Sequence, residues 1–395
     1  MTHLHLAVAL DGAGWHPGAW RDPLARPAEL FGARYWADLA AEAERGFLDF
    51  LTFEDALAVQ SSRWEGPDGR TDQVRGRLDA VLVAARLAAV TSAIGLVPTT
   101  STTHTEPFHV AIGIASLDHA TSGRAGWRPQ VSGKAADALH FGRRTLPVFA
   151  PEEYGTGAVA EVVAGLFGEA ADAVEAVRRL WDSWEDDAII RDTDTGRYVD
   201  RAKLHYIDFE GRHFSVRGPS ITPRPPQGQP LITALAHDVV PYEFAARSAD
   251  VVYVTPHSVA DAHTIVGAVR EAERTVGRTG APLRVFADLV VFLGPAAADR
   301  KDALDELDGA PYTSDALVFT GTADDLADLL SSWQETGIEG FRLRPGALPR
   351  DLHHITRDLV PALQARGAFR GAYAEDVLRT RLGLARPANR YAPAP

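Results

Sequence analysis

Acidic, basic, hydroxyl and imidazole side chains follow directly after short apolar runs of this chain. The candidates placed in this way are Asp11, His16, Glu54, Asp55, Thr102, Thr103, His104, Thr105, Arg128, Ser132, His237 and Asp238. Histidine changes its charge near neutral pH, and carboxyl groups can act as acids or bases, so these residue types predict proton transfer or the binding of a polar ligand. They can act together only if the apolar runs before them are neighbouring strands.

The apolar runs predict eight β-strands, with segments of helical periodicity between them. The predicted strands are Leu4–Leu10, Leu48–Phe53, Ile94–Thr99, Gly126–Val131, Pro230–Ala234, Val251–Thr255, Leu283–Phe292 and Gly340–Arg344. Strands that alternate with helices are typical of a parallel sheet, and eight such units close a barrel. The sequence therefore predicts an α/β fold, a (β/α)8 or TIM barrel, with its active site at the carboxyl ends of the strands.

Four segments are longer than ordinary connections between strands and helices. They are about 56–79, 132–170, 186–228 and 294–320. The third contains short β-type runs and predicts a small β excursion, and three of the four follow a strand and should rise at the active-site face. Since no internal repeat or low-complexity linker divides the chain, we expect one barrel domain over residues 1–395 that carries these insertions.

The composition excludes several classes of protein. The formal net charge is -13, which disfavours nucleic acids and anionic membranes as partners. The chain has no cysteine, so disulfides, thiolate nucleophiles and iron–sulfur clusters are excluded. No apolar stretch approaches the ~20 residues of a membrane span, and the first residues do not form a signal peptide. We therefore expect a soluble, cytoplasmic protein.

Two local patterns suggest a ligand but are weaker. His3 and His5 would share one face of a strand, as metal ligands can, but they stand where the strand begins and not at its carboxyl end. The run Gly12-Ala13-Gly14 lacks the third glycine of a dinucleotide-binding loop. We therefore predict no metal site and no dinucleotide site.

Longer motifs occur along nearly the whole chain. They are Gly14–Arg21, Ala41–Asp55, Thr91–Trp127, Leu180–Ala188, Phe214–Pro219, Pro223–Gly228, Leu359–Pro361 and Arg379–Leu384. This set resembles the luciferase-like superfamily of flavin-dependent monooxygenases, in particular its branch of nitrilotriacetate, dibenzothiophene-sulfone and pristinamycin-type enzymes. The resemblance implies a TIM barrel that takes reduced FMN from a separate flavin reductase and uses O2 to insert one oxygen atom into a small molecule. It also implies a homodimer or homotetramer, with a heterodimer as a further possibility.

The resemblance also implies roles for individual residues. The expected catalytic residues are His16, Asp55 and His104. The expected flavin contacts are Asp55, Thr102, Thr103, Thr105, Trp127, Arg128, Ser132, Ala236, His237 and Asp238.

Some residues depart from the family's pattern at the cofactor phosphate. Where the family has a tyrosine and then a Gly-Ser-Ser run, this chain has Phe167 and Ala236-His237-Asp238, and Pro241 replaces a glycine. Phenylalanine cannot donate a hydrogen bond, and aspartate repels a phosphate. The alternative function is therefore a partner subunit that has lost catalysis or the normal binding of the FMN phosphate.

Overall fold

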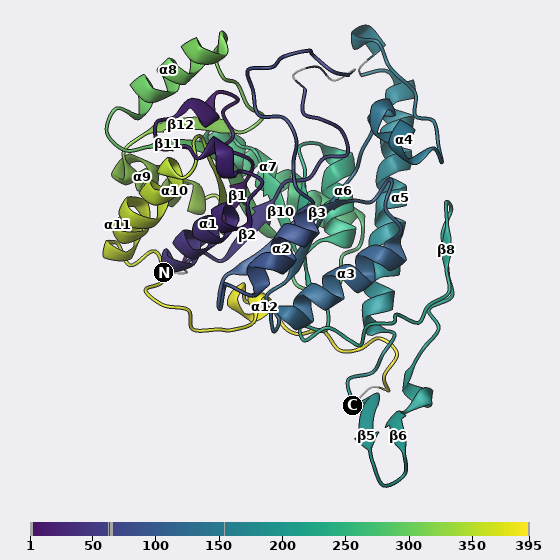
Figure 1. Cartoon of the computed structure of the whole chain (residues 1–395). Helices are drawn as coiled ribbons and strands as arrows, with labels where there is room; N and C mark the ends of the chain where they lie inside the picture. The colour runs from purple at the N-terminus through teal and green to yellow at the C-terminus, as the bar shows by residue number, and fades with distance from the viewer. Residues whose placement is uncertain (1–2, 62, 64–65, 154, 394–395) are drawn as a thin grey trace.

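Eight parallel strands close around one interior (Figure 1). The computed structural model describes residues 3–61, 63, 66–153 and 155–393. In order around the barrel the strands are β1 (His5–Leu10), β2 (Phe50–Phe53), β3 (Gly95–Ser101), β4 (Gly126–Gln130), β9 (Leu231–Leu235), β10 (Val251–Val254), β11 (Arg284–Leu293) and β13 (Gly340–Pro345). β13 pairs with β1, with His5 opposite Gly340, and this pairing closes the ring. The predicted barrel and its eight strands are confirmed.

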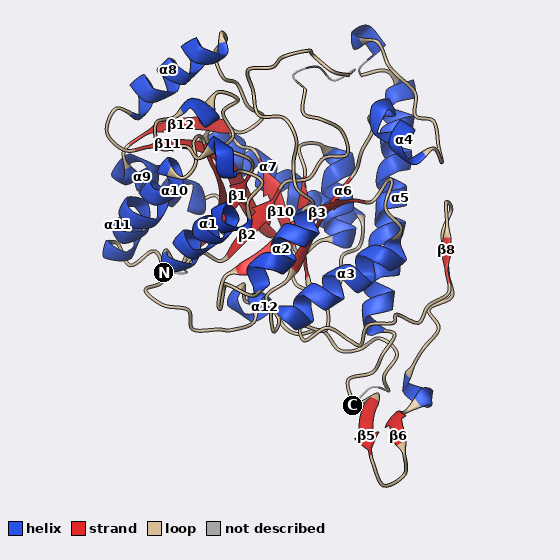
Figure 2. Ribbon diagram, viewed as in Figure 1, coloured by secondary structure: helices blue, strands red, loops and turns tan. Residues whose placement is uncertain are grey.

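Helices surround the strands on the outside (Figure 2). They are α1 (Ala33–Arg45), α2 (Ala80–Ala88), α3 (Pro107–Ala120), α4 (Ala135–Phe141), α5 (Gly157–Asp182), α6 (Val239–Ser248), α7 (Val259–Thr275), α8 (Ala297–Asp308), α9 (Ala323–Gln334), α10 (Arg350–His354), a π-helical turn (Ile355–Leu359), α11 (Val360–Ala365) and α12 (Leu378–Arg381). The helix α9 begins with a capping box, in which Thr322 and Asp325 bond each other's backbone N–H. Within the described part of the chain, no helix has the length and apolarity needed to cross a bilayer.

The amino end of the barrel is closed by apolar side chains. Leu378 and Leu382, in and just after α12, form one buried cluster with Phe50 and Phe286 from inside the barrel. The packing is close enough that a Cβ atom at Gly340 would lie 2.6 Å from the Phe286 ring, so this position requires glycine. Because this end is filled, the barrel interior opens at its carboxyl end.

The insertions contain more regular structure than the sequence indicated. The segment 186–228 forms two hairpins, β5 (Ile189–Asp192) with β6 (Arg197–Val199) and β7 (Phe209–Glu210) with β8 (Ser215–Val216), which matches the predicted β excursion. The segment 294–320 holds α8 and most of a ninth strand, β12 (Leu317–Gly321), which pairs with the second half of β11. The first turns of α5 are largely exposed, so no apolar stripe marked them as helix within 132–170.

Candidate active site

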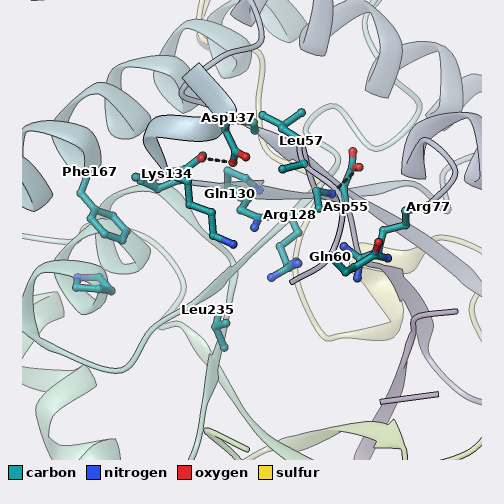
Figure 3. Close-up of a pocket in the computed structure, with 18 of the residues that line it drawn as sticks. Asp55, Leu57, Gln60, Arg77, Arg128, Gln130, Lys134, Asp137, Phe167 and Leu235 are labelled. Atoms are coloured by element: carbon teal, nitrogen blue, oxygen red, sulfur yellow. Dashed lines mark hydrogen bonds between the residues drawn. The ribbon is translucent and has the colours of Figure 1, made fainter. Parts of the chain in front are cut away.

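A cavity of about 640 Å³ opens at the carboxyl ends of β2, β3, β4 and β9 (Figure 3). Its lining residues are Asp55–Ser61, Arg77, Ser101, Arg128–Lys134, Asp137, Phe167, Leu235, His237, Pro241 and Phe244. The volume lies within the range of ~300–1,000 Å³ that is usual for sites that take small molecules and cofactors. The walls combine aromatic rings with charged groups, so the cavity suits a ligand that is flat and apolar in part and polar at its edge.

A network of buried charges lies in the barrel interior beneath this cavity. The carboxylate of Asp288 on β11 accepts hydrogen bonds from Nε of Arg342 at 2.8 Å and from Nε of Arg344 at 3.0 Å, both on β13. Arg342 Nη1 also lies 3.4 Å from Oε1 of Glu54, and Glu54 forms an ion pair with Arg128. These side chains come from four strands or strand ends and meet because alternate residues of each strand point into the barrel.

The network is almost completely shielded from solvent. The exposed fractions are 0% for Asp288, 1% for Arg342 and 2% for Arg344. Burial opposes the charge of the Asp288 carboxyl, but the two guanidinium groups outweigh it and hold its pKa below the usual value. The same balance, with Arg128 and Arg342 as the opposing cations, lowers the pKa of Glu54. The floor of the cavity is therefore charged, and the ionisation state of its groups does not change near neutral pH.

Arg128 connects this floor to the cavity. Its Nε donates to Oγ1 of Thr99 at 2.8 Å, and its Nη2 pairs with Glu54. These two contacts fix the plane of the guanidinium group, and Figure 3 shows its end directed into the cavity. An oriented cation at this place can bind an anionic or strongly electron-rich part of a ligand.

Asp55 lies on the same cavity wall, in the loop after β2. Burial raises the pKa of its carboxyl to about 6, whereas the backbone N–H of Ala56 and the Arg77 guanidinium act in the opposite direction. A carboxyl group that titrates near pH 6 can hold or release a proton under ordinary conditions.

The raised pKa of Asp55 predicts a pH-dependent gain in stability for the Asp55→Asn variant. In the wild-type protein the folded state disfavours the ionised carboxyl, so a free-energy penalty appears above pH 4 and is complete above about pH 6. Because the group borders an open cavity, we expect the variant to gain only about 1 kcal/mol at pH 8, and nothing at pH 4. Urea unfolding at both pH values measures this difference.

Asp192 in the β5–β6 hairpin, whose side chain accepts a hydrogen bond from Thr195 Oγ1 and whose pKa is lowered by that contact, provides the control. Asp192→Asn should give no gain at pH 8. A gain for Asp55→Asn that is equal at pH 4 and pH 8 would show that ionisation is not its cause.

Ser132 and His237, two of the predicted flavin contacts, also line the cavity. Ser132 Oγ donates to Oδ2 of Asp137 at 2.6 Å, and the backbone N–H of Ser132 donates to Oγ1 of Thr103 at 2.9 Å. Nδ1 of His237 lies 3.3 Å from Oγ1 of Thr255, and its side chain is about half exposed. The structure thus brings Asp55, Arg128, Ser132 and His237 together around one space.

The segment Thr102–Thr105 lines a different and smaller cavity, of about 120 Å³. There the His104 ring stacks on Phe141 with ring centroids 4.9 Å apart, and its Nε2 is buried without a hydrogen-bond partner among the residues described. Thr102 donates from its backbone N–H to the carbonyl of Gln130 at 2.9 Å. The bonds of Thr102 and Thr103 to Gln130 and Ser132 hold the end of β4 and the loop after it in place.

His16 borders a third cavity, of about 220 Å³, near the first strand. Its Nδ1 accepts from the backbone N–H of Gly18 at 2.9 Å, and its Nε2 lies 2.9 Å from Oδ1 of Asp305. Burial lowers the pKa of this imidazole, with Asp305 opposing. With both ring nitrogens engaged, His16 joins the first loop to α8.

Trp127, Ala236 and Asp238 do not line the larger cavity. The Trp127 ring is fully buried on the outer side of the barrel, where it packs against Trp181 of α5 with centroids 6.4 Å apart. Ala236 is buried in the barrel wall.

Other lining residues were not among the predicted site residues. Gln60, Gln130, Lys134 and Phe244 line the cavity. Figure 3 shows the Lys134 side chain directed into the space beside Phe167. Lys134 is one of only three lysines in the chain, and this rarity is the one feature of the sequence that could have marked it as a site residue.

Comparisons with known proteins identify the family of this chain. A family model described as luciferase-like monooxygenase matches residues 13–340. The sequence is 31% identical to nitrilotriacetate monooxygenase component A of Aminobacter aminovorans over 98% of both chains. It is 35% identical to one of the pristinamycin IIA synthase polypeptides of Streptomyces pristinaespiralis, over 59% of this chain and 70% of that one.

The solved structure of EDTA monooxygenase from Chelativorans sp. BNC1 has the same fold. It superposes with a TM-score of 0.82 and covers 97% of this chain and 99% of the other, at 24% sequence identity. At this identity the likeness concerns the fold alone.

Proposed function

Because this chain belongs to the luciferase-like monooxygenase family, we propose that it is a monooxygenase that receives reduced flavin from a separate reductase and oxidises a small organic molecule. The observation that carries the proposal is the cavity of about 640 Å³ at the carboxyl ends of the strands, with aromatic rings on one wall and oriented charges on another. This is the end of a barrel at which enzymes of this fold place their active sites.

The overall reaction balances without a metal. Reduced flavin supplies two electrons and two protons, one atom of O2 is transferred to the substrate, and the other leaves as water. Bound flavin would supply this redox chemistry, and the protein would orient the reactants and exclude bulk water.

The residues around the cavity fit one part of FMN and not the other. Leu57 and Val131 offer an apolar surface to a flat ring, and Arg128 offers a cation to its polar edge. The phosphate finds no such match. Backbone N–H groups at the start of α6 could bind a phosphate. There, however, the Asp238 carboxylate already accepts the hydrogen bond of the Val239 N–H, and Pro241 has no N–H. The predicted cofactor therefore fits through its ring system only.

Within this function we propose that Asp55 and Arg128 contact the bound ligand. Asp55 would hold or release a proton, and Arg128 would orient the polar edge of the ring. His16 and His104, which the sequence suggests as catalytic residues, border other cavities, and we propose that they position the surrounding loops. We further propose a cytoplasmic homodimer or homotetramer, as the resemblance implies.

A second candidate function is that of a partner chain in a synthase built from two different polypeptides. The observation that favours it is the 35% identity to one of the pristinamycin IIA synthase polypeptides, together with the lost phosphate donors. In this case the flavin would bind to another chain.

The rate of flavin reoxidation separates the two functions. We expect an excess of this protein to change the rate at which photoreduced flavin reacts with O2 by at least several-fold, because bound flavin is shielded from bulk water. Stopped-flow absorbance with and without protein measures the rate. A rate equal to that of free flavin at every protein concentration would contradict the oxygenase and favour the partner chain.

A further inference from the structure

The first turn of α6 stands at the cavity, since His237 just before the helix and Pro241 in that turn are lining residues, as is Phe244 of the second turn. A helix start of this kind usually attracts phosphate, because its first N–H groups have no partner in the helix. Here the protein supplies its own anion: Oδ1 of Asp238 accepts from Val239 N at 2.7 Å. Pro241 removes a further N–H from the same turn. This helix start therefore repels a phosphate.

The wall next to this helix start is hydrocarbon. The ring of Phe167 on α5 meets Phe244 of α6 edge to face, with centroids 5.5 Å apart. Neither ring can donate a hydrogen bond, and a phosphate against them would lose its hydration without compensation.

A second acid lies at the start of α4. Asp137 is in the first turn of that helix, is more than nine-tenths buried and lines the cavity. Its Oδ2 already accepts the Ser132 hydroxyl, so that hydroxyl is not available to a phosphate. Its Oδ1 is buried and has no hydrogen-bond partner among the described residues. A buried carboxylate oxygen without a donor is costly, and a ligand hydroxyl would satisfy it.

Arg77 and Arg128 already form ion pairs with Asp11 and Glu54, so the lining groups that could favour a phosphate are His237 and Lys134, whose side chain points into the cavity (Figure 3). Lys134 stands three residues before Asp137 in the sequence, and Asp238 caps the helix on the adjacent wall. One ammonium does not outweigh the neighbouring carboxylates and phenyl rings for a dianion.

From these contacts we propose that the cavity selects a flavin without a phosphate, of the riboflavin type, over FMN. The inference rests on the proposed function and names the form of the flavin. The ribityl chain of riboflavin ends in hydroxyl groups, which can donate to carboxylates such as Asp137. The phosphate of FMN can only accept at neutral pH, and it meets acids and phenyl rings instead.

Titration of the full-length protein with riboflavin and with FMN, followed by flavin fluorescence and calorimetry, tests the proposal. We expect riboflavin to bind about tenfold more tightly than FMN. This ratio corresponds to the repulsion between the phosphate and one carboxylate in a partly hydrated site. Tighter binding of FMN would overturn the inference and leave the flavin-dependent function standing. If neither compound bound at millimolar concentration, both the inference and the function would fail.

Two variants locate the selectivity. The double change Asp238→Ser and Phe167→Tyr keeps a good helix cap and adds two hydroxyl donors, so FMN should bind about tenfold more tightly while riboflavin is unaffected. Asp200→Ser is the matched control: its carboxylate also caps a helical turn, at Ala202 N, but in the β5–β6 excursion. It should change neither affinity.

Lys134→Met tests the opposing explanation. If Lys134 held a phosphate, this variant would weaken the binding of FMN selectively and the proposal would be wrong. We expect the ratio of the two dissociation constants to stay within about twofold of the wild-type ratio, since riboflavin and FMN would meet the same ring environment.

Discussion

The Asp288→Asn variant is expected to lose about 3–5 kcal/mol of unfolding free energy, the largest effect of any substitution considered for this protein. Asp288 is fully buried and accepts hydrogen bonds from both Arg342 and Arg344. Asparagine has nearly the same shape but no charge, so two guanidinium groups would be left in the barrel interior with too little negative charge. Urea unfolding followed by circular dichroism measures the loss.

A surface ion pair provides the matched comparison. Asp324 pairs with Arg366 at 3.2 Å, and its side chain is 80% exposed. Asp324→Asn should cost well under 1 kcal/mol, because water screens this pair. A loss of similar size in both variants would mean that the buried network does not stabilise the barrel as described.

The Arg128→Met variant is expected to weaken the binding of reduced flavin by about 10- to 100-fold, the value of one or two hydrogen bonds to a charged group. Reduced flavin is largely anionic at neutral pH, whereas oxidised flavin is neutral. The affinity for oxidised flavin should therefore fall only a few-fold. Anaerobic titrations with both forms, or the midpoint potential of the bound flavin, measure this split. The midpoint potential of the bound flavin should fall, because the variant weakens the binding of the reduced form more than that of the oxidised form.

Arg63→Met removes the same charge from an exposed position of the loop after β2, outside the cavity lining. It should change neither affinity. Equal weakening of both oxidation states by Arg128→Met would indicate lost packing and not a charge contact, and thermal unfolding of both variants shows whether the fold is retained.

The barrel could be predicted because its signal is local. Each strand is a short run of β-branched and apolar residues, and every predicted run overlaps an observed strand, as with Leu283–Phe292 and β11 (Arg284–Leu293). β12 was missed because its residues Leu317–Gly321 are only half buried at the rim of the barrel. Such a strand lacks the strong apolar pattern that marks a buried one.

The site was harder to predict because a strand end fixes the position of a residue and not the direction of its side chain. Trp127 and Arg128 are adjacent on β4, yet Trp127 packs outward on α5 and Arg128 points into the barrel. Because side chains alternate along a strand, only one of two adjacent residues faces the barrel interior. Which of the two does so depends on the side chains that the interior must accommodate.

One available signal pointed to the charged interior. Arg342 and Arg344 are two residues apart in a strand that was expected to be buried, so they share a face. Two arginines on one face of such a strand require buried acids opposite them, and Asp288 in the long apolar run of β11 was such an acid. By contrast, the cavity residues Gln60 and Lys134 come from irregular loops, whose course no periodicity predicts.

A crystal structure of the protein with reduced riboflavin, prepared under anaerobic conditions, would show whether the cavity at the carboxyl ends of β2, β3, β4 and β9 is the flavin site. We expect density for the ring system in the cavity beside Asp55, Leu57 and Arg128. Density for the ring in the cavity beside His16, or an empty cavity in crystals saturated with the flavin, would contradict this assignment.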